Sequence, residues 1–427
     1  MSIANRAALA VTPARTAALD IVEAGLEAID TASALRRAVR LADGALHVDG
    51  ESWPLHARGR LLLVAVGKCA GAAAAELRRL LGDRLDGGVV LDVDGSPPRD
   101  LGPLVSLRGS HPLPSERNVA ASRRVVDLLD GAGGDDLVLG VVSGGGSTLL
   151  CLPPGGGGAG PEAAALDALT RAAAPIEAIN TVRKHASLAR GGGLAAHAHP
   201  ARVVALIVSD VPGAAADFVA SGPTCRDDTT VDDARRVLRR YGLDAIALPL
   251  IETPKDARLF ERVRNVVLVS NDVALGAMAA KAAGLGFDPA IVTRTAAGEA
   301  RELGARVVRD LRAAAPGSAL LYGGETTVTV SGRGRGGRNQ ELALSALRSV
   351  ADDEIVVAVA SDGRDNGDAA GAVADAAARE HARRLGLDAE ACLADNDSGA
   401  FYERTGDRLV TGSTGSNVAD LIVALRR

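Results

Sequence analysis

Positively charged side chains stand beside glycines at two places where a strand is predicted to end. Lys68 follows Gly67 directly after the apolar run LLLVAV, and Arg338 closes the arginine-rich part of the stretch GGETTVTVSGRGRGGRNQE at 323–341. A guanidinium can donate two parallel hydrogen bonds to a phosphate or a carboxylate, and lysine supplies a point charge. Neighbouring glycines let the backbone approach a ligand closely. Both places therefore predict a site for a small anion, with a solvated turn as the alternative.

The segment SGGGST is a further glycine-rich loop after a predicted strand. It contributes the hydroxyls of Ser143 and Ser147 and the backbone amides of Gly144, Gly145 and Gly146. Successive amides of this kind form a concave site for an anion. Three consecutive glycines are rarely required by packing alone, so we predict that this loop binds phosphate.

A predicted helix in INTVRKHASLAR carries an amide and several cations at helical spacing. Asn180, Arg183 and Lys184 lie three and four residues apart, which places them on neighbouring positions of the helix. No acidic residue occurs between Asn180 and Arg190. A solvated helix face usually mixes both signs of charge. The pattern therefore favours contacts with an anionic substrate over a merely solvated face.

Two aspartates follow apolar strands at positions that suit a metal ion. Asp210 ends VVALIVSD, and Asp362 ends IVVAVASD. Magnesium takes oxygen ligands and usually keeps waters alongside substrate phosphates. We predict that these carboxylates hold the metal or orient a reacting hydroxyl. The alternative for each is a helix cap or a turn.

Further polar residues lie near the arginine-glycine stretch and near the last predicted strand. Glu325 and Asn339 belong to the stretch around Arg338, and Thr414 and Asn417 belong to STGSNVADL. We predict that these four residues contact substrate or phosphate.

The elements that must position these groups read as alternating strands and helices. From Leu61, apolar runs alternate with alanine-rich helical stretches, and a second set of runs follows a segment with Pro249 and Pro254. Alternation through Thr326, Val328 and Val330 predicts a strand in the second set. A chain of 427 residues exceeds the range of one growing core. We therefore predict two α/β domains, residues 1–245 and 246–427.

Composition narrows the classes of partner. The net charge of −5 argues against a nucleic-acid binder. The four cysteines form no Cys-x-x-Cys pair, which is typical of small buried residues in a reduced compartment. No apolar run reaches the length of a membrane span, and the alanine-rich start lacks a signal core. We expect a cytoplasmic protein without a membrane partner, and homo-oligomerisation stays open.

Taken in order, the motifs resemble one enzyme family. They are GKCAG, GSHPLPSE, SGGGSTLL, INTVRKH with RGGGLA, SDVPGAAADFVASGPT, GGETTVTVSGRGRGGRNQE, SDGRDNGDAAGAVAD, and NDS followed by TGSTGSNVADL. The set spans Lys68 to Leu421 and resembles the glycerate 2-kinase family, whose C-terminal part is called the MOFRL domain. The resemblance implies a Rossmann-like, mostly parallel first domain and a MOFRL region at about 318–425. It also implies a site in a cleft between two α/β domains.

The resemblance implies an activity and a pair of catalytic residues. The activity is ATP-dependent phosphorylation of the 2-hydroxyl of D-glycerate to 2-phosphoglycerate, with Mg²⁺ or another divalent cation. By motif, Lys68 of GKCAG and Arg338 of GGRNQE are the catalytic residues, and we assign them to the transferring phosphoryl group and the substrate charge. One departure is visible: SDVPGAAADFVASGPT is rich in alanine, with Asp217 the only acid after Pro212.

Two other functions stay open at this point. Family members are also labelled as hydroxypyruvate reductases, but no stretch has the dinucleotide fingerprint, and GRGRGG leads into Asn339-Gln340-Glu341 without a clear βαβ acid. A non-catalytic sugar-phosphate binding protein could use the same glycine loops. The sequence leaves the acceptor, the phosphoryl donor and the metal undetermined.

Overall fold

The computed structural model describes residues 2–210 and 216–427. It divides into two compact units. The parallel-sheet unit holds Ala34–Ser209 and the described residues up to Leu268. The mixed-sheet unit holds the described residues up to Ser33, Asp210 and Val269–Arg427. Each unit has a six-stranded sheet with helices, which confirms the predicted class of two α/β domains.

The parallel sheet has the strand order β6-β5-β4-β7-β8-β9. Its strands are β4 (Leu61–Val66), β5 (Gly87–Val93), β6 (Leu104–Gly109), β7 (Leu137–Ser143), β8 (Arg202–Val208) and β9 (Val263–Val269). The neighbours from β6 to β8 are all parallel. β4 and β7 are buried along their whole length, as expected for parallel strands with both faces covered.

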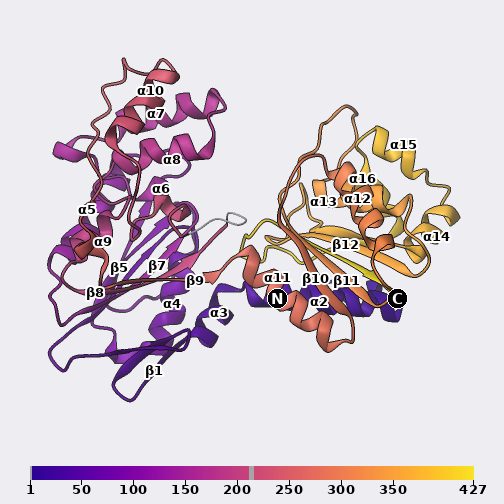
Figure 1. Cartoon of the computed structure of the whole chain (residues 1–427), viewed down its shortest axis with the longest axis horizontal. Coiled ribbons are helices and arrows are strands. Elements are labelled where there is room, and N and C mark those ends of the chain that lie inside the picture. Colours follow the sequence, from indigo (N-terminus) through magenta and orange to yellow (C-terminus); the bar gives the residue numbers. More distant parts are fainter. Residues whose placement is uncertain (1, 211–215) are drawn as a thin grey trace. The chain divides into compact units, whose positions relative to one another are not determined.

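Helices and a small sheet surround these strands. The helices are α3 (Thr31–Ala38), α4 (Ala70–Leu81), α5 (Glu116–Asp130), α6 (Gly146–Leu149), α7 (Gly160–Arg171), α8 (Ile176–His185), α9 (Gly193–Ala198) and α10 (Val231–Arg240), with short 3₁₀ turns η1 (Gly82–Arg84), η2 (Pro154–Gly156), η3 (Val219–Ser221) and η4 (Ala257–Phe260). The small antiparallel sheet contains β1 (Val39–Ala42), β2 (Ala45–Val48) and β3 (Glu51–Pro54). Figure 1 shows α7, α8 and α10 gathered at the top of this unit, and α8 packs on both α7 and α10.

The mixed sheet has the order β10-β11-β15-β12-β13-β14. Its strands are β10 (Asp288–Ala296), β11 (Ser318–Gly324), β12 (Glu354–Ala360), β13 (Gly371–Asp375), β14 (Arg408–Leu409) and β15 (Asp420–Arg426). The helices of the unit are α1 (Arg6–Leu9), α2 (Pro13–Ala28), α11 (Asn271–Gly284), α12 (Ala300–Ala313), α13 (Arg338–Leu347), α14 (Ala376–Arg384), α15 (Ala389–Ala394) and α16 (Ser398–Thr405). β10 and β11 are parallel, and the other neighbours are antiparallel.

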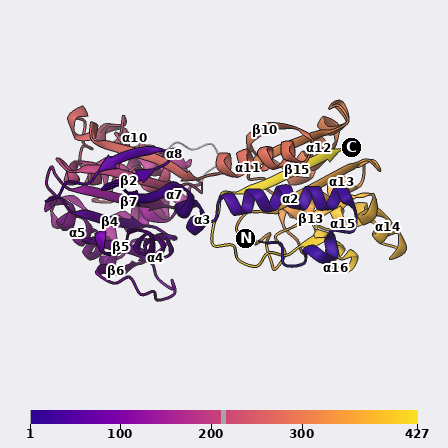
Figure 2. The same cartoon turned by 90° about the horizontal axis from the view of Figure 1, so that it is seen from below.

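The division of the chain differs from the predicted boundary between residues 245 and 246. Helix α2 belongs to the mixed-sheet unit, where Figure 2 shows it lying along β15. Its Arg15 is buried and pairs with Asp375 at 2.7 Å and with Asp407 at 2.8 Å. Local periodicity predicts that α2 is a helix, but it carries no information about which distant residues the helix meets.

Two segments that were predicted as strands of the second domain are not strands of its sheet. The run at 266–269 falls in β9, which extends the parallel sheet instead of starting the second set. The alternating segment at 326–330 is not a strand, and its only ladder contact among the described residues is an isolated bridge between Thr327 and Glu299. Both sides of β11 are already occupied, by β10 and β15. The segment is held by Gly298 and Glu299, since the amide of Thr327 donates to the carbonyl oxygen of Gly298 at 2.9 Å and that of Thr329 donates to the carboxylate of Glu299 at 3.2 Å.

No helix in the described part of the chain is long and apolar enough to cross a membrane. None of the four cysteines forms a disulfide in the described part of the chain, and two of them are buried and two partly exposed.

Candidate functional site

Lys68 and the glycine loop (Ser143 to Thr148) meet at the carboxyl ends of β4 and β7. These strands are paired in register up to Val66 and Val142. The backbone amide of Lys68 donates to the carbonyl oxygen of Gly144 at 2.9 Å. Gly67 has a φ of 116°, and a Cβ atom there would lie 2.2 Å from the Ser143 hydroxyl. Only glycine therefore permits this close approach of the two strand ends.

The Ser143 hydroxyl joins the two strand ends. It donates to the carbonyl oxygen of Val66 at 3.3 Å and accepts from the amide of Cys69 at 3.3 Å. The side chain is only 2% exposed. Ser143 was predicted to contact phosphate, but its hydroxyl bonds to backbone groups instead.

The backbone amides of the first two residues of α4 are engaged within the protein. The amide of Ala70 donates to the carbonyl oxygen of Gly67 at 3.0 Å, and that of Gly71 donates to the buried carboxylate of Asp92 at 3.1 Å. In contrast, the amides of residues 144–147 donate to no group in the described part of the chain. The amides available for an anion therefore belong to the glycine loop and not to α4.

Two basic side chains flank the middle of the glycine loop. A Cβ atom on Gly145 would lie 3.2 Å from Cγ of Lys68 and 3.4 Å from Cδ2 of His111. Gly145 has a φ of 83°, which favours glycine. Gly146 is packed equally closely, because a Cβ atom there would lie 2.6 Å from the Cβ atom of Ala220.

A short chain of polar groups connects the loop to helix α8. The hydroxyl of Ser221 lies 3.0 Å from that of Ser147 and 3.1 Å from Oδ1 of the buried Asn180. Ser221 has a φ of 59°, and its neighbour Ala220 has a φ of 53°, so this turn is strained for side-chain-bearing residues. The predicted contact residues Ser147 and Asn180 thus belong to one cluster with Lys68 and the loop.

The cations of the 180–190 segment have different surroundings. Lys184 is buried and pairs with Asp227 at 3.1 Å, and Arg190 is buried and pairs with Glu162 at 2.7 Å. The guanidinium of Arg183 has no ion pair, and its Nε is buried without a hydrogen-bond partner, in the part of the chain that the structure describes. Burial, together with repulsion from Arg190, lowers the pKa of Arg183 to about 10.

Arg338, at the start of α13, is held by two carboxylates. Its Nε and Nη2 donate to Asp420 at 2.6 and 3.1 Å, and its Nη1 donates to Glu325 at 2.7 Å. Asp420 is 2% exposed. Burial raises the pKa of Asp420 to about 6, because it outweighs the opposing hydrogen bond and charge of Arg338. The same pairing raises the pKa of Arg338 despite its partial burial. The guanidinium is therefore oriented before any ligand arrives.

A buried aspartate caps α13 behind Arg338. Asp365 accepts from the backbone amides of Asn339 and Gln340 at 2.9 and 2.8 Å. The Asn339 side chain also donates to Asp420 at 2.8 Å. Burial raises the pKa of Asp365. The amides of Asn339 and Gln340 are thus engaged by a carboxylate within the protein.

The arginine-glycine loop before α13 is held by residues 395–397. Asn396 accepts from the amides of Ser331 and Gly332 at 2.8 and 2.9 Å, and Asp395 accepts from that of Arg333 at 2.9 Å. The loop borders an open cavity of ≈ 680 Å³ whose polar lining includes Thr326, Arg335, Arg338, Arg364 and Asn366. The lining also includes Glu325, Glu341 and Asp365, so three arginines share this cavity with three acids.

The remaining predicted residues of the mixed-sheet unit lie around a second loop. Asp362 accepts from the amide of Arg364 at 2.9 Å, and its carbonyl oxygen accepts from the amide of Thr414. The Thr414 hydroxyl donates to the carbonyl oxygen of Ser361 at 2.6 Å, and Asn417 accepts from the amide of Ala419 at 3.0 Å. These side chains shape the loop, and Asn417 is exposed.

Asp210 follows β8 and precedes residues 211–215, which lie outside the described residues. Asp210 was predicted as a metal ligand together with Asp362. No cluster of three or more histidine, cysteine, aspartate or glutamate side chains with metal-binding geometry occurs in residues 2–210 and 216–427.

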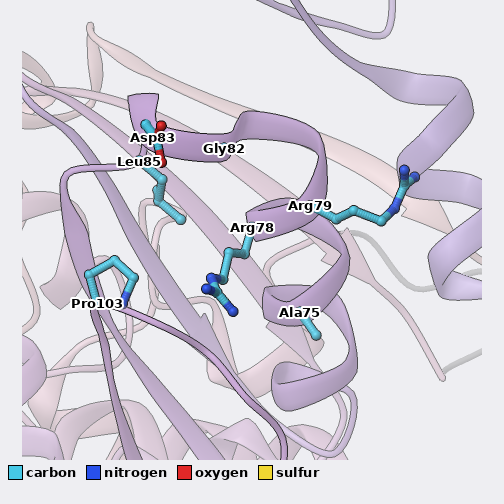
Figure 3. A pocket seen from close by; sticks show the side chains of 7 residues that line it. All are labelled: Ala75, Arg78, Arg79, Gly82, Asp83, Leu85 and Pro103. Carbon is cyan, nitrogen blue, oxygen red and sulfur yellow. The ribbon is translucent and has the colours of Figure 1, made fainter.

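Another cavity of ≈ 570 Å³ lies away from this chemistry. Figure 3 shows Arg78 and Arg79 of α4 beside Gly82, Leu85 and Pro103. These residues lie near the end of α4 remote from Lys68, roughly 15 Å along the helix axis. Both arginines already pair with acids, Arg78 with Asp100 and Arg79 with Glu76. We therefore do not assign this cavity to the site.

Sequence reasoning missed four residues that the geometry brings to the two clusters: His111, Ser221, Asp365 and Asp420. All four lie inside the motifs GSHPLPSE, SDVPGAAADFVASGPT, SDGRDNGDAAGAVAD and TGSTGSNVADL. The signal was present, but no spacing rule distinguished these residues from their neighbours.

Comparisons with known proteins agree with this arrangement. Residues 17–252 match the domain of unknown function DUF4147, and residues 318–420 match the MOFRL family. A protein of Pyrococcus horikoshii named glycerate 2-kinase is 34% identical, covering 96% of this chain and 98% of that protein. An Agrobacterium vitis protein, provisionally named as a hydroxypyruvate reductase, is 38% identical over 86% of this chain and 87% of its own length.

A solved structure extends the likeness to the fold. The crystal structure of a glycerate kinase from Thermotoga maritima superposes with a TM-score of 0.83 at 34% identity, covering 96% of this chain and 99% of that one. Family matches over both halves of the chain and a near full-length relative together lead to one conclusion: the chain belongs to the glycerate 2-kinase family.

Proposed function

We propose that the protein is a glycerate 2-kinase, which transfers a phosphoryl group from ATP to the 2-hydroxyl of D-glycerate. The observation that carries the proposal is the glycine loop, whose amides at 144–147 are open and whose middle is flanked by Lys68. The relative from Pyrococcus horikoshii, which carries the same name over nearly its whole length, supports it.

Phosphoryl transfer depends mainly on positioning and on neutralising charge. The open amides and the exposed Lys68 suit the phosphate oxygens, whose negative charge must be stabilised as the transfer proceeds. Arg338 suits a second anionic group, since Asp420 and Glu325 fix the direction of its guanidinium. We propose that both sets of residues serve the same reaction, because a single turnover needs a donor and an acceptor.

Magnesium fits this scheme as an ion that accompanies the nucleotide. It usually binds through one or two carboxylates and substrate phosphates, without a dedicated cage of protein ligands. Asp362 has one carboxylate oxygen engaged by the amide of Arg364, and the chemistry of the second suits a hard cation. We therefore keep Asp362 and Asp210 as the proposed carboxylates. The ion would neutralise phosphate charge while Lys68 and the loop amides orient the phosphoryl group.

The name of the Agrobacterium relative makes hydride transfer the second candidate function. A dinucleotide site would use the fingerprint of glycines between a strand and a helix. Here the amides at the start of α4 are engaged by Ser143, Gly67 and Asp92. This occupancy favours the kinase over the reductase.

The experiment measures both reactions with one preparation of the full chain. ADP release is followed with ATP, Mg²⁺ and a panel of short hydroxy acids, and NMR locates the new phosphate on the product. NADH oxidation with hydroxypyruvate is followed in parallel. We expect phosphate on C2 of D-glycerate and no NADH oxidation. Hydride transfer without ADP release would reject the proposal, and nucleotide or sugar-phosphate binding without either reaction would indicate a non-catalytic binder.

Three further predictions from the sequence accompany the proposal: the cleft between the domains, the cytoplasmic location and homo-oligomerisation. They stay predictions.

A further inference from the structure

Arg183 differs from its neighbours Lys184 and Arg190 in having no ion pair within the described residues. Lys184 and Arg190 are each paired with a buried acid, Asp227 and Glu162. Lys68 and Arg183 form no ion pair within the described residues. Lys68 is exposed at a strand end beside the loop, where phosphate is proposed to bind. Arg183 is therefore the cation of α8 that forms no ion pair in the described part of the chain, although the carboxylate of Glu162 attracts it at longer range.

Arg183 also lies beside the polar chain that leads to the loop. It stands three residues after Asn180 on α8, so the two side chains are neighbours on the helix surface. Asn180 contacts Ser221, which contacts Ser147 of the loop. A long helical side chain extends toward the N-terminal turn, which here is the turn of Asn180.

The unpaired Nε of Arg183 and its repulsion from Arg190 would both be relieved by a bound anion. Its Nε is buried without a partner, and its charge faces that of Arg190. A buried donor left unpaired is costly, and a carboxylate can satisfy two guanidinium donors at once. Glu162, the carboxylate that attracts Arg183, forms no hydrogen bond with it and already accepts from Arg190 and from the thiol of Cys151.

We propose that Arg183 binds the carboxylate of the acceptor substrate and thereby selects short hydroxy acids over neutral polyols. The inference rests on the proposed function only for the identity of the acid, D-glycerate. Arg183 is then a specificity-determining residue. Phosphate recognition remains with Lys68 and the loop amides.

The test compares Arg183→Gln and Arg183→Lys with the wild-type protein on D-glycerate and on its neutral amide, glyceramide. A charge-assisted hydrogen bond to a carboxylate corresponds to roughly a 10- to 100-fold change in affinity. We expect the KM for D-glycerate to rise by about that factor in Arg183→Gln, with the KM for ATP unchanged. Glyceramide should bind both proteins equally weakly. Arg183→Lys should recover only part of the loss, because an ammonium lacks the planar fork.

Arg239→Gln is the matched control, since Arg239 is exposed on α10, which packs against α8. Thermal melting of each variant separates misfolding from lost recognition. An unchanged KM for D-glycerate in a folded Arg183→Gln protein, or an equal loss for glyceramide, would overturn the inference.

Titration calorimetry with D-glycerate alone separates this inference from the proposed function. Arg183-dependent binding of D-glycerate by a wild-type protein without kinase activity would reject the function and keep the inference. If the wild-type protein is an active kinase and the Arg183 variants bind D-glycerate as tightly as it does, the proposed function is kept and the inference is rejected. Absence of D-glycerate binding to the wild-type protein, with or without ATP, would reject both.

Discussion

The glycine loop and the arginine-glycine loop differ in whether their hydrogen-bond donors and cations have partners within the protein. At the glycine loop, the amides of residues 144–147 and the side chains of Lys68 and Arg183 have no partners in the described part of the chain. At the arginine-glycine loop, Arg338 pairs with Asp420 and Glu325, and the amides of residues 331–335 are engaged by residues 395–397.

This difference indicates different tasks. A region with unpaired donors gains most when an anion binds, because the anion satisfies groups that the protein leaves open. A cation between two carboxylates attracts an anion less strongly, but its direction is already set. We therefore expect the glycine loop to govern phosphate affinity and turnover, and the arginine-glycine loop to govern orientation.

The largest expected effect tests the role of the open region. Lys68→Ala should lower kcat by about 10²- to 10³-fold, because loss of one group that stabilises transition-state charge has this magnitude. Lys68 is exposed, so the melting temperature should change little. Steady-state kinetics at saturating substrate measure the effect, with exposed Lys281→Ala on α11 as control. Near-normal turnover of Lys68→Ala would remove this residue from the chemistry.

Arg338→Lys should be almost as impaired as Arg338→Ala, with kcat/KM reduced by roughly 10²-fold, because only the guanidinium fork spans Asp420 and Glu325 while facing a ligand. Arg348→Lys is the control, since Arg348 is an exposed arginine at the other end of α13, where it pairs with Glu390. Full activity of Arg338→Lys would show that charge alone suffices. A raised KM with normal kcat would assign Arg338 to ground-state binding.

Asp420→Asn should lower kcat by about tenfold above pH 7, because it weakens charge-assisted hydrogen bonds that orient Arg338. The pH profile is the sharper measurement. With a pKa of about 6, Asp420 is a carboxylate above that pH and a neutral acid below it. Wild-type turnover should therefore fall as the pH drops through 6. Asp420→Asn should not show this fall in turnover at low pH. Asp353→Asn, near the far end of β15, is the control and should show it.

The stability of the same variant follows from the raised pKa. Between the unfolded value of about 3.9 and the folded value, the folded state binds more protons, so the free energy of unfolding should decrease as the pH rises through this range. Asp420→Asn should lose that part of the slope. Identical urea-denaturation slopes against pH in both proteins would contradict the assignment of the raised pKa to Asp420.

The smallest effect tests the fit of the loop around Lys68. Gly145→Ala combines left-handed backbone strain with a Cβ atom 3.2 Å from Lys68, so we expect kcat to fall several-fold. Gly155→Ala is the matched control, because Gly155 has a φ of 71° and open space around it. Backbone strain of about 1–2 kcal/mol should lower the stability of both variants alike. Equal activity of the two would show that the contact with Lys68 is unimportant.

Several parts of the fold could be predicted from the sequence because they depend on local pattern. The buried strands β4, β7 and β8 are continuous apolar runs, and the helices α4 and α5 follow β4 and β6 after short loops. Because parallel strands end at one edge of a sheet, the meeting of Lys68 with the SGGGST loop follows from that pattern.

Other parts depend on contacts between residues far apart in the chain. Local alternation predicted a strand at 326–330, but the backbone of this segment bonds to Gly298 and Glu299 and forms only an isolated bridge. The membership of α2 in the mixed-sheet unit depends on Arg15 meeting Asp375 and Asp407, about 360 to 390 residues away.

The sequence by itself determined which residue types face the chemistry: Lys68, the SGGGST loop and Arg338 all stand at the ends of elements that local periodicity defines. Only the tertiary structure decided which donors remain open. Ser143 and Lys184 read as ligand contacts in the sequence, yet each bonds to a backbone or acidic partner within the protein. The physical reason is that a donor's availability depends on the acceptors packed around it, and those acceptors come from distant parts of the chain.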